Sequence, residues 1–280
     1  MINLGRYNTL RVARFSDYGI YLTDDDAQKP SEVLLPGRYV TDLMAVGDML
    51  DVFVYKDSED RPVAVTEHPY IQVGEFAYLQ ASQVNKFGAF MDWGLPKNLL
   101  CPFSEQKVKM LPGGMYLVYA YLDKETDRVV ASAKINKFLD NVYPDYEKGQ
   151  EVKALVIGHT DIGYQVIVNN LHRGMIYDNE IYAPLEVEST VTAYVKNVRD
   201  DGKIDLTMTQ PGTMGRIAKI ADKIMEMLGE DAFSLTDKSS PDDIKAVLHC
   251  SKKDYKKAVG YLYREHRVAI SPDGVISAVK

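Results

Sequence analysis

The sequence predicts a mainly β protein with a C-terminal α+β domain. Two observations support this fold class: a strand pattern occurs three times, and helical periodicity begins near residue 215 of the 280 residues. Three glycine pairs, each fourteen residues apart, mark the repeats: Gly5 and Gly19, Gly74 and Gly88, and Gly149 and Gly163. Internal repeats of this kind indicate one structural unit that is built several times.

Each repeat opens with two strand-like runs. The first runs cover 6–14, 75–84 and 150–157, each directly after a glycine. The second runs, 17–22, 86–91 and 161–166, contain the other glycine of each pair. Because a glycine inside a strand commonly marks a β-bulge or a barrel corner, we expect one of the two at Gly19, Gly88 and Gly163, and a bulge at Gly88 would let Phe87 and Phe90 share the outer face.

Each repeat closes with a β-rich run and a short final strand. The β-rich runs cover 49–55, 115–122 and 189–195, and the final strands cover 61–66, 128–132 and 203–207. Acidic turns such as 58–60 and 200–202 join them as hairpin connections do. About five short strands in roughly 60–70 residues are typical of an OB barrel. We therefore expect three tandem barrels in 1–67, 68–144 and 145–210, before a fourth domain in 211–280.

The chain changes character at residues 210–212, after which helical signals dominate. From Gly215 five apolar residues share one helical face as far as Gly229: Ile217, Ile220, Ala221, Ile224 and Leu228. Ser240, followed by Pro241, can cap a second helix that ends at Leu248.

Ser251 can cap a third helix, with Asp254 at the capping-box position. Its apolar face consists of Tyr255, Ala258, Val259 and Leu262. Two short strands, 268–270 and 275–276, follow around a turn at 271–274. Three helices and a two-stranded wing predict a winged helix-turn-helix.

Composition and charge narrow the class of protein. A hydrophobic content of 46% with 26% charged residues excludes disordered and collagen-like chains. The net charge is −7, but segments 1–67, 70–145, 146–210 and 211–280 carry −5, 0, −4 and +2. Segments 70–145 and 211–280 carry no net negative charge and can therefore bind phosphate groups. Neither a membrane span nor a signal peptide is apparent, and Cys101 and Cys250 are expected to be buried thiols, so a cytoplasmic protein is predicted.

The second repeat resembles the S1 RNA-binding domain, a five-stranded OB barrel. The resemblance rests on Phe87 and Phe90 around Gly88, on the segment 99–105, and on Asp127 and Arg128 before the last strand. Pro102 replaces a histidine that is usual in the S1 pattern. The aromatic pair is Tyr18 and Tyr21 in the first repeat, whereas Ile162 and Gln165 stand at those positions in the third. The third barrel should therefore be the weakest RNA reader or a structural spacer.

Three S1-like barrels followed by a winged helix resemble the conserved virulence factor B family of bacterial RNA-binding regulators. The resemblance covers essentially the whole chain, and the architecture is its most specific part. It implies that the barrels and the winged helix bind RNA and affect the expression of virulence genes.

Aromatic side chains and flanking cations are the predicted RNA contacts of the barrels. Stacking on an aromatic ring contributes about 1–3 kcal/mol per base, and cations follow the phosphates. In the second barrel we expect Lys86, Phe87, Phe90 and Arg128 to bind RNA. In the first we expect Phe15, Tyr18, Tyr21 and Arg61 to do so, with Arg14 beside them. The alternative for any one aromatic ring is the barrel core, which also applies to Trp93 as a core or loop anchor.

The third helix of the tail supplies a basic surface. Lys252, Lys253, Lys256 and Lys257 lie opposite its apolar face, and residues 251–268 carry a net charge of +4. Such a face can bind nucleic acid through phosphates, although it can also be an ordinary solvated surface. Because 251–263 contains no Arg, Asn or Gln to read base edges, weak sequence specificity is expected.

Enzyme signatures are absent from the sequence. The glycine spacing of a P-loop occurs at 158–163, but Tyr164 and Gln165 follow in place of Lys and Ser or Thr. The five histidines show no ligand spacing, and Asp24, Asp25 and Asp26 are expected to form a solvated loop rather than a metal site. We expect no catalytic activity, no cofactor and no metal.

Three functions are compatible with these patterns. The first is a non-catalytic protein that binds single-stranded RNA and regulates gene expression after transcription. The second is an adaptor whose acidic barrels bind a protein partner. The third is a regulator that binds duplex DNA through the winged helix.

Overall fold

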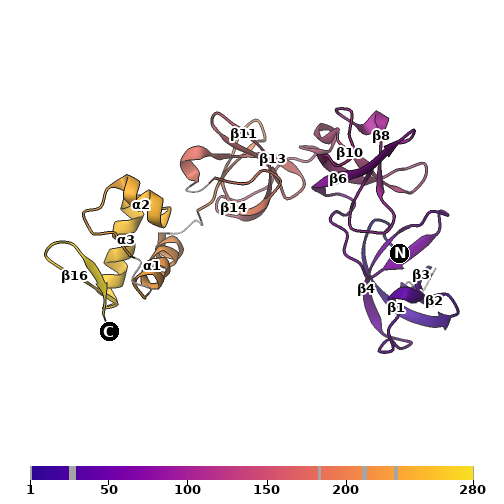
Figure 1. Cartoon of the computed structure of the whole chain (residues 1–280), viewed down its shortest axis with the longest axis horizontal. Coiled ribbons are helices and arrows are strands. Elements are labelled where there is room, and N and C mark those ends of the chain that lie inside the picture. The colour runs from indigo at the N-terminus through magenta and orange to yellow at the C-terminus, as the bar shows by residue number, and fades with distance from the viewer. Residues whose placement is uncertain (1, 25–29, 182–183, 210–212, 230–232, 280) are drawn as a thin grey trace. The chain divides into compact units, whose positions relative to one another are not determined.

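The structure is a computed structural model that describes residues 2–24, 30–181, 184–209, 213–229 and 233–279. It contains three closed five-stranded barrels and a C-terminal helical region with a small sheet, which follow one another along the chain (Figure 1). The chain divides into two compact units, Met1–Asn141 and Val142–Lys280. The predicted fold class is confirmed.

Barrel 1 is formed by β1 (Arg6–Ser16), β2 (Gly19–Thr23), β3 (Glu32–Pro36), β4 (Met49–Lys56) and β5 (Pro62–Val65). The strands are hydrogen-bonded in the closed order β1-β2-β3-β5-β4, with β3 parallel to β5 and the other neighbours antiparallel. Side chains alternate along the strands, so that Leu10, Val12, Ile20 and Leu22 fill the interior.

Barrels 2 and 3 repeat this topology. Barrel 2 contains β6 (Phe76–Asn85), β7 (Gly88–Met91), β8 (Leu99–Pro102), β9 (Met115–Leu122) and β10 (Val129–Ser132). Barrel 3 contains β11 (Glu151–Thr160), β12 (Gly163–Val168), β13 (His172–Tyr177), β14 (Thr190–Val198) and β15 (Ile204–Thr207). A short 3-10 turn follows the third strand of each barrel, at Gly37–Tyr39, Phe103–Glu105 and Asp178–Glu180. The third strand of each barrel, β3, β8 and β13, was not predicted from the sequence.

The repeated glycine does not lie in a bulge, so that alternative is wrong. The register shifts on the preceding strand instead, between Val12 and Arg14, Ala81 and Gln83, and Val156 and Gly158. Gly88 closes a two-residue turn opposite Asn85, with a φ of +148°. A Cβ there would lie 2.3 Å from the Cys101 carbonyl oxygen on β8. The position requires glycine because the backbone is left-handed and a neighbouring strand is too close for a side chain.

Barrels 1 and 2 share a continuous apolar core. Phe53 and Tyr55 of β4 pack edge-on against Trp93, with ring centroids 5.7 and 5.8 Å apart. Trp93 is 2% exposed, and its Nε1 donates to the Lys97 carbonyl oxygen at 2.6 Å. The tryptophan is therefore a core anchor, and its position explains why the two barrels form one compact unit.

The C-terminal region contains α1 (Thr213–Gly229), α2 (Pro241–Leu248) and α3 (Lys252–Arg264), followed by β16 (Val268–Ile270) and β17 (Ile276–Ala278). Ser240 and Asp243 form a reciprocal capping box at the start of α2, and the Ser251 hydroxyl accepts from the Asp254 amide at the start of α3. The predicted apolar face of α3 is buried in full. The second wing strand begins at Ile276, one residue later than predicted.

Some remaining expectations are also decided by the structure. Both cysteines are buried and neither forms a disulfide, as predicted. Within the part of the chain that the structure describes, no helix has the length and apolar character needed to cross a membrane. The predicted change at residues 210–212, and Asp25 and Asp26 of the acidic loop, lie outside the described residues. The four domain boundaries stay a prediction.

Candidate nucleic-acid interface

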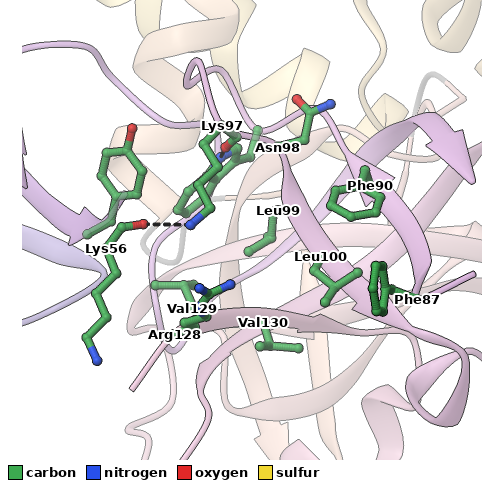
Figure 2. A pocket seen from close by; sticks show the side chains of 12 residues that line it. Lys56, Phe87, Phe90, Lys97, Asn98, Leu99, Leu100, Arg128, Val129 and Val130 are labelled. Carbon is green, nitrogen blue, oxygen red and sulfur yellow. Dashed lines mark hydrogen bonds between the residues drawn. The ribbon is translucent and has the colours of Figure 1, made fainter. Parts of the chain in front are cut away.

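A cavity of about 320 Å³ opens on the face of barrel 2 (Figure 2). Phe87, Phe90, Leu100 and Val130 line it on the barrel 2 side. Tyr55 and Lys56 of barrel 1 line its rim, because β4 ends beside barrel 2. The volume is at the lower end of the about 300–1,000 Å³ range of pockets that hold small molecules.

Strand register brings the two phenylalanines together. Phe90 on β7 faces Leu100 on β8, and Leu100 in turn faces Val130 on β10, so these side chains point to one side of the sheet. Phe87 occupies the second position of the turn between β6 and β7, where the Asn85 side chain accepts from its amide at 2.9 Å. The turn leaves the Phe87 ring 60% exposed at the cavity. The two rings therefore share a face because of the turn and not because of a bulge.

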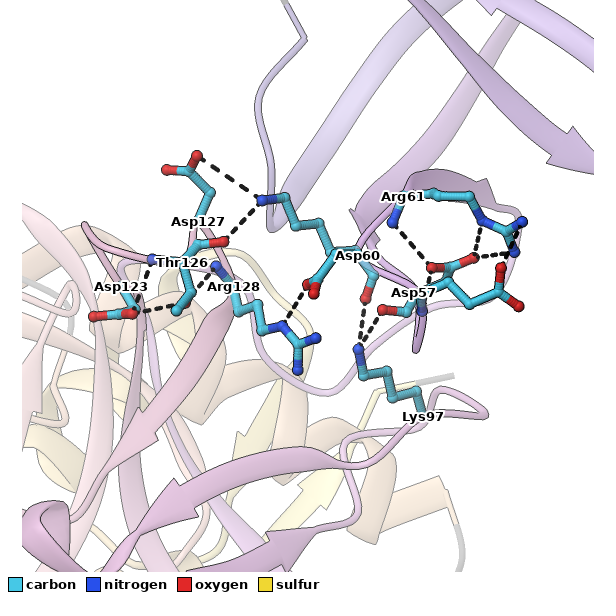
Figure 3. A network of polar contacts seen from close by, with 10 residues as sticks. Asp57, Asp60, Arg61, Lys97, Asp123, Thr126, Asp127 and Arg128 are labelled. Carbon is cyan, nitrogen blue, oxygen red and sulfur yellow. Dashed lines mark hydrogen bonds and ion pairs between the residues drawn. The ribbon is translucent and has the colours of Figure 1, made fainter. Parts of the chain in front are cut away.

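The cations around the cavity differ in whether a carboxylate compensates their charge. Lys86 is exposed, and its Nζ lies 5.1 Å from the centroid of the Phe87 ring. The Arg128 guanidinium instead donates to Asp60 of barrel 1 at 2.5 Å, so most of its charge is compensated (Figure 3). The role of Lys86 and Arg128 as phosphate contacts stays a prediction. Lys86 is the better candidate of the two because its charge is exposed, whereas Arg128 is paired with Asp60.

Lys97, which sequence reasoning missed, also lines the cavity. Its Nζ donates to the carbonyl oxygens of Lys56 at 3.0 Å and Asp57 at 2.6 Å, across the junction of the two barrels (Figure 3). Burial lowers the pKa of this ammonium. Lys97 thus adds a half-buried positive charge to the cavity that Phe87 and Phe90 line.

In barrel 1 the equivalent face is covered by its own side chains. The Arg14 guanidinium lies 3.7 Å from the centroid of the Tyr21 ring and donates to Glu32 at 2.8 Å. Tyr18 and Phe15 are 77% and 50% exposed. Arg61 forms ion pairs with Asp57 and Glu59, both at 2.8 Å. The predicted residues are thus at the surface, but the ring that corresponds to Phe90 is already stacked.

Barrel 3 has no aromatic ring at either position of the pair. Ile162 lies exposed at the turn and Gln165 stands in the place of Phe90. Tyr164 is buried, with its ring 4.3 Å from that of His159, which pairs with Asp178 at 3.1 Å. These contacts agree with the expectation that barrel 3 contributes least stacking.

On α3 the predicted lysines lie opposite the buried face. Lys253, Lys256 and Lys257 are exposed and Lys252 is half-buried. Lys256 is 3.9 Å from Asp237, a weak contact at such exposure. Gly260 follows these lysines on the helix, and a Cβ there would have no heavy atom within 4 Å. The helix thus presents a basic surface.

Two family models match parts of this chain. A model of the S1 domain matches residues 4–67, which form barrel 1, and a model of the CvfB-like winged helix domain matches residues 222–276. The S1 match falls on the first barrel, whereas the sequence motifs pointed most clearly to the second.

Curated proteins resemble the chain over most of its length. Conserved virulence factor B of Staphylococcus aureus (strain MRSA252) is 26% identical, over 85% of this chain and 82% of that protein. The protein YitL of Bacillus subtilis (strain 168) is 25% identical, over 94% of this chain and 90% of its own length. The predicted resemblance to conserved virulence factor B is confirmed.

A solved structure can also be aligned with the chain. It is a crystal structure of a multidomain protein with nucleic acid binding domains from Streptococcus pneumoniae, and it is 22% identical. The alignment covers 99% of this chain and 98% of that one, with a TM-score of 0.39.

Proposed function

We propose that this protein is a non-catalytic regulator that binds single-stranded RNA, with the cavity of barrel 2 as its principal base-contacting site. The observation that carries the proposal is the pair of phenyl rings, Phe87 and Phe90, at one open apolar cavity. Single-stranded nucleic acid is held by such stacking rings together with cations along the backbone. A duplex offers no free base faces, so this site selects single strands.

The cations that would contact phosphates lie in two parts of the chain. Near the cavity Lys86 supplies an exposed charge, and on α3 the predicted lysines supply several. Phosphate contacts of this kind carry no sequence information and weaken as salt rises. Because separate modules on one chain raise each other's effective concentration, modest contacts at each suffice for binding a long strand.

The regulatory role rests on the relatives. A relative that is 26% identical over 85% of this chain carries the name conserved virulence factor B. We infer a cytoplasmic protein that acts on RNA after transcription and thereby on virulence genes, with no cofactor.

A second function is favoured by one observation. The exposed basic surface of α3 is also suited to the backbone of duplex DNA. A duplex of equal length that displaced bound RNA would favour this alternative over the first.

Fluorescence anisotropy with a labelled unstructured RNA of about thirty nucleotides tests the proposal at two salt concentrations. The intact protein should bind, and Phe87→Ala with Phe90→Ala should weaken binding by at least about tenfold, since each stacked base contributes about 1–3 kcal/mol. Tyr143→Ala is the control because Tyr143 is an exposed aromatic outside both candidate surfaces. Unchanged affinity of a folded double variant would contradict the assignment of the site.

A further inference from the structure

The cavity of barrel 2 is lined by one side-chain amide, that of Asn98, which the proposed stacking does not use. Asn98 directly precedes β8 and lines the cavity together with Phe90. Phe90 faces Leu100, and Asn98 lies two residues before Leu100, so both side chains belong to the same side of the sheet. Figure 2 shows the Asn98 amide at the Phe90 end of the cavity.

The amide group of Asn98 is available to a ligand. The side chain is half-buried, and it forms no hydrogen bond with any residue that the structure describes. The cations that line the same cavity are committed elsewhere: Lys97 to two backbone carbonyls and Arg128 to Asp60. Asn98 is thus the polar group of this wall best placed to meet the edge of a stacked base.

Comparison of the three barrels shows that this arrangement is specific to barrel 2. Glu32 in barrel 1 and Arg173 in barrel 3 occupy the position of Asn98. Each lies two residues before the residue that pairs with the position of Phe90, which is Leu34 opposite Tyr21 in barrel 1 and Met175 opposite Gln165 in barrel 3. Glu32 holds Arg14 over Tyr21, which closes that face. In barrel 2 the residue opposite Phe90 is the uncharged Gln83, so the ring is left open.

An amide offers one acceptor and two donor hydrogens side by side. Adenine matches this pattern on two edges, through N6–H with N7 and through N6–H with N1, and asparagine is a common partner of adenine. A purine also covers more of an aromatic ring than a pyrimidine does. The aromatic rings thus favour a purine, and the Asn98 amide can pair with an edge of adenine.

We propose that Asn98 reads the edge of a base stacked on Phe87 and Phe90, and that this cavity prefers adenine. The proposal rests on the proposed function and adds a base preference and the residue that determines it. It differs from the expectation for α3, which has no side chain suited to base readout.

Competition anisotropy with two single-stranded RNAs, twelve adenosines and twelve uridines, tests the inference on the full chain. We expect the ratio of their Kd values to favour adenosine roughly 5- to 150-fold, the range for one bidentate base contact. Asn98→Ala should reduce this ratio to the part that stacking alone supplies and leave the affinity for the uridine strand unchanged. Asn98→Asp, which keeps the shape and loses the donor, should have the same effect on the ratio.

Gln83→Ala is the matched control, because it removes an exposed amide opposite Phe90 that does not line the cavity. It should leave the ratio unchanged. A ratio near one in the unsubstituted protein, or a ratio that survives both Asn98 substitutions, would overturn the role of Asn98 while RNA binding itself stands. Failure to bind either strand would overturn the proposed function as well.

Discussion

Gly88 shows at the scale of a single residue how backbone geometry positions the aromatic site. The turn that it closes holds Phe87 beside the ring of Phe90, and the chain can make this turn only where no Cβ meets the Cys101 carbonyl. Equivalent approaches, at 2.1 and 2.3 Å, occur at Gly19 and Gly163. The spacing of the three glycines therefore reflects a shared requirement of the hairpin.

Gly88→Ala should lower the free energy of unfolding of the first unit by about 1–3 kcal/mol from backbone strain, with a further loss from the contact with β8. Denaturant unfolding of the intact protein measures this change. Gly113→Ala is the control, because Gly113 also has a positive φ of +81° but has nothing within 4 Å of a Cβ. Equal losses in the two variants would mean that the close approach to β8 is unimportant.

The residues of the candidate site were only partly predictable from the sequence. Phe87 and Phe90 were identified because they stand beside a repeated glycine in a known pattern. Asn98 carries no such signal, and although Leu100 belongs to the segment 99–105 of the S1 pattern, its position beside Phe90 depends on the pairing of β7 with β8. The ion pairs of Arg14 and Arg128 were missed for the same reason, because each partner lies on another strand or in another barrel.

At the scale of elements, the strands that were predicted are those with long β-rich runs, a marker glycine, or a hairpin turn before a short final strand. The strands β3 and β13 have none of these, and β8 has only four residues. The helices of the tail were predicted to within a few residues, because caps and apolar periodicity are local properties of the sequence. The bulges were misplaced because they depend on the partner strand.

The junction between barrels 1 and 2 joins β4 and β5 to the turn before β10. Its exposed ion pair between Arg128 and Asp60 holds the pKa of that carboxyl below its usual range, chiefly through the hydrogen bond from the guanidinium. A depressed carboxyl pKa stabilises the folded state above the unfolded value of about 3.9. This contribution is lost as the pH falls through the lower folded value.

Asp60→Asn should therefore lower the Tm of the first unit at neutral pH and make no difference in strong acid. Thermal unfolding from about pH 7 to about pH 2 shows whether the Tm values of the two proteins converge. Glu125→Gln provides the comparison, because this carboxyl on the neighbouring turn forms no ion pair with the described residues. A difference in Tm that stayed constant throughout would contradict the pairing.

At the scale of the whole molecule, stacking surface and free positive charge lie in different parts of the chain. Barrels 1 and 2 hold most of the exposed aromatic rings, but the arginines predicted there, Arg14, Arg61 and Arg128, are paired with carboxylates. Residues 251–268 carry a net charge of +4, mostly on the exposed side of α3. The proposed binding of RNA is therefore compatible with a net charge of −7.

The most direct test of this account is ultraviolet crosslinking of the intact protein to an unstructured RNA, followed by mass spectrometry of the peptides. The account predicts crosslinks at Phe87 or Phe90 on the cavity of barrel 2, with others on α3. Phe87→Ala with Phe90→Ala should remove the first set and retain the second. Crosslinks confined to α3, with the barrel 2 cavity unlabelled, would contradict the claim that bases bind there.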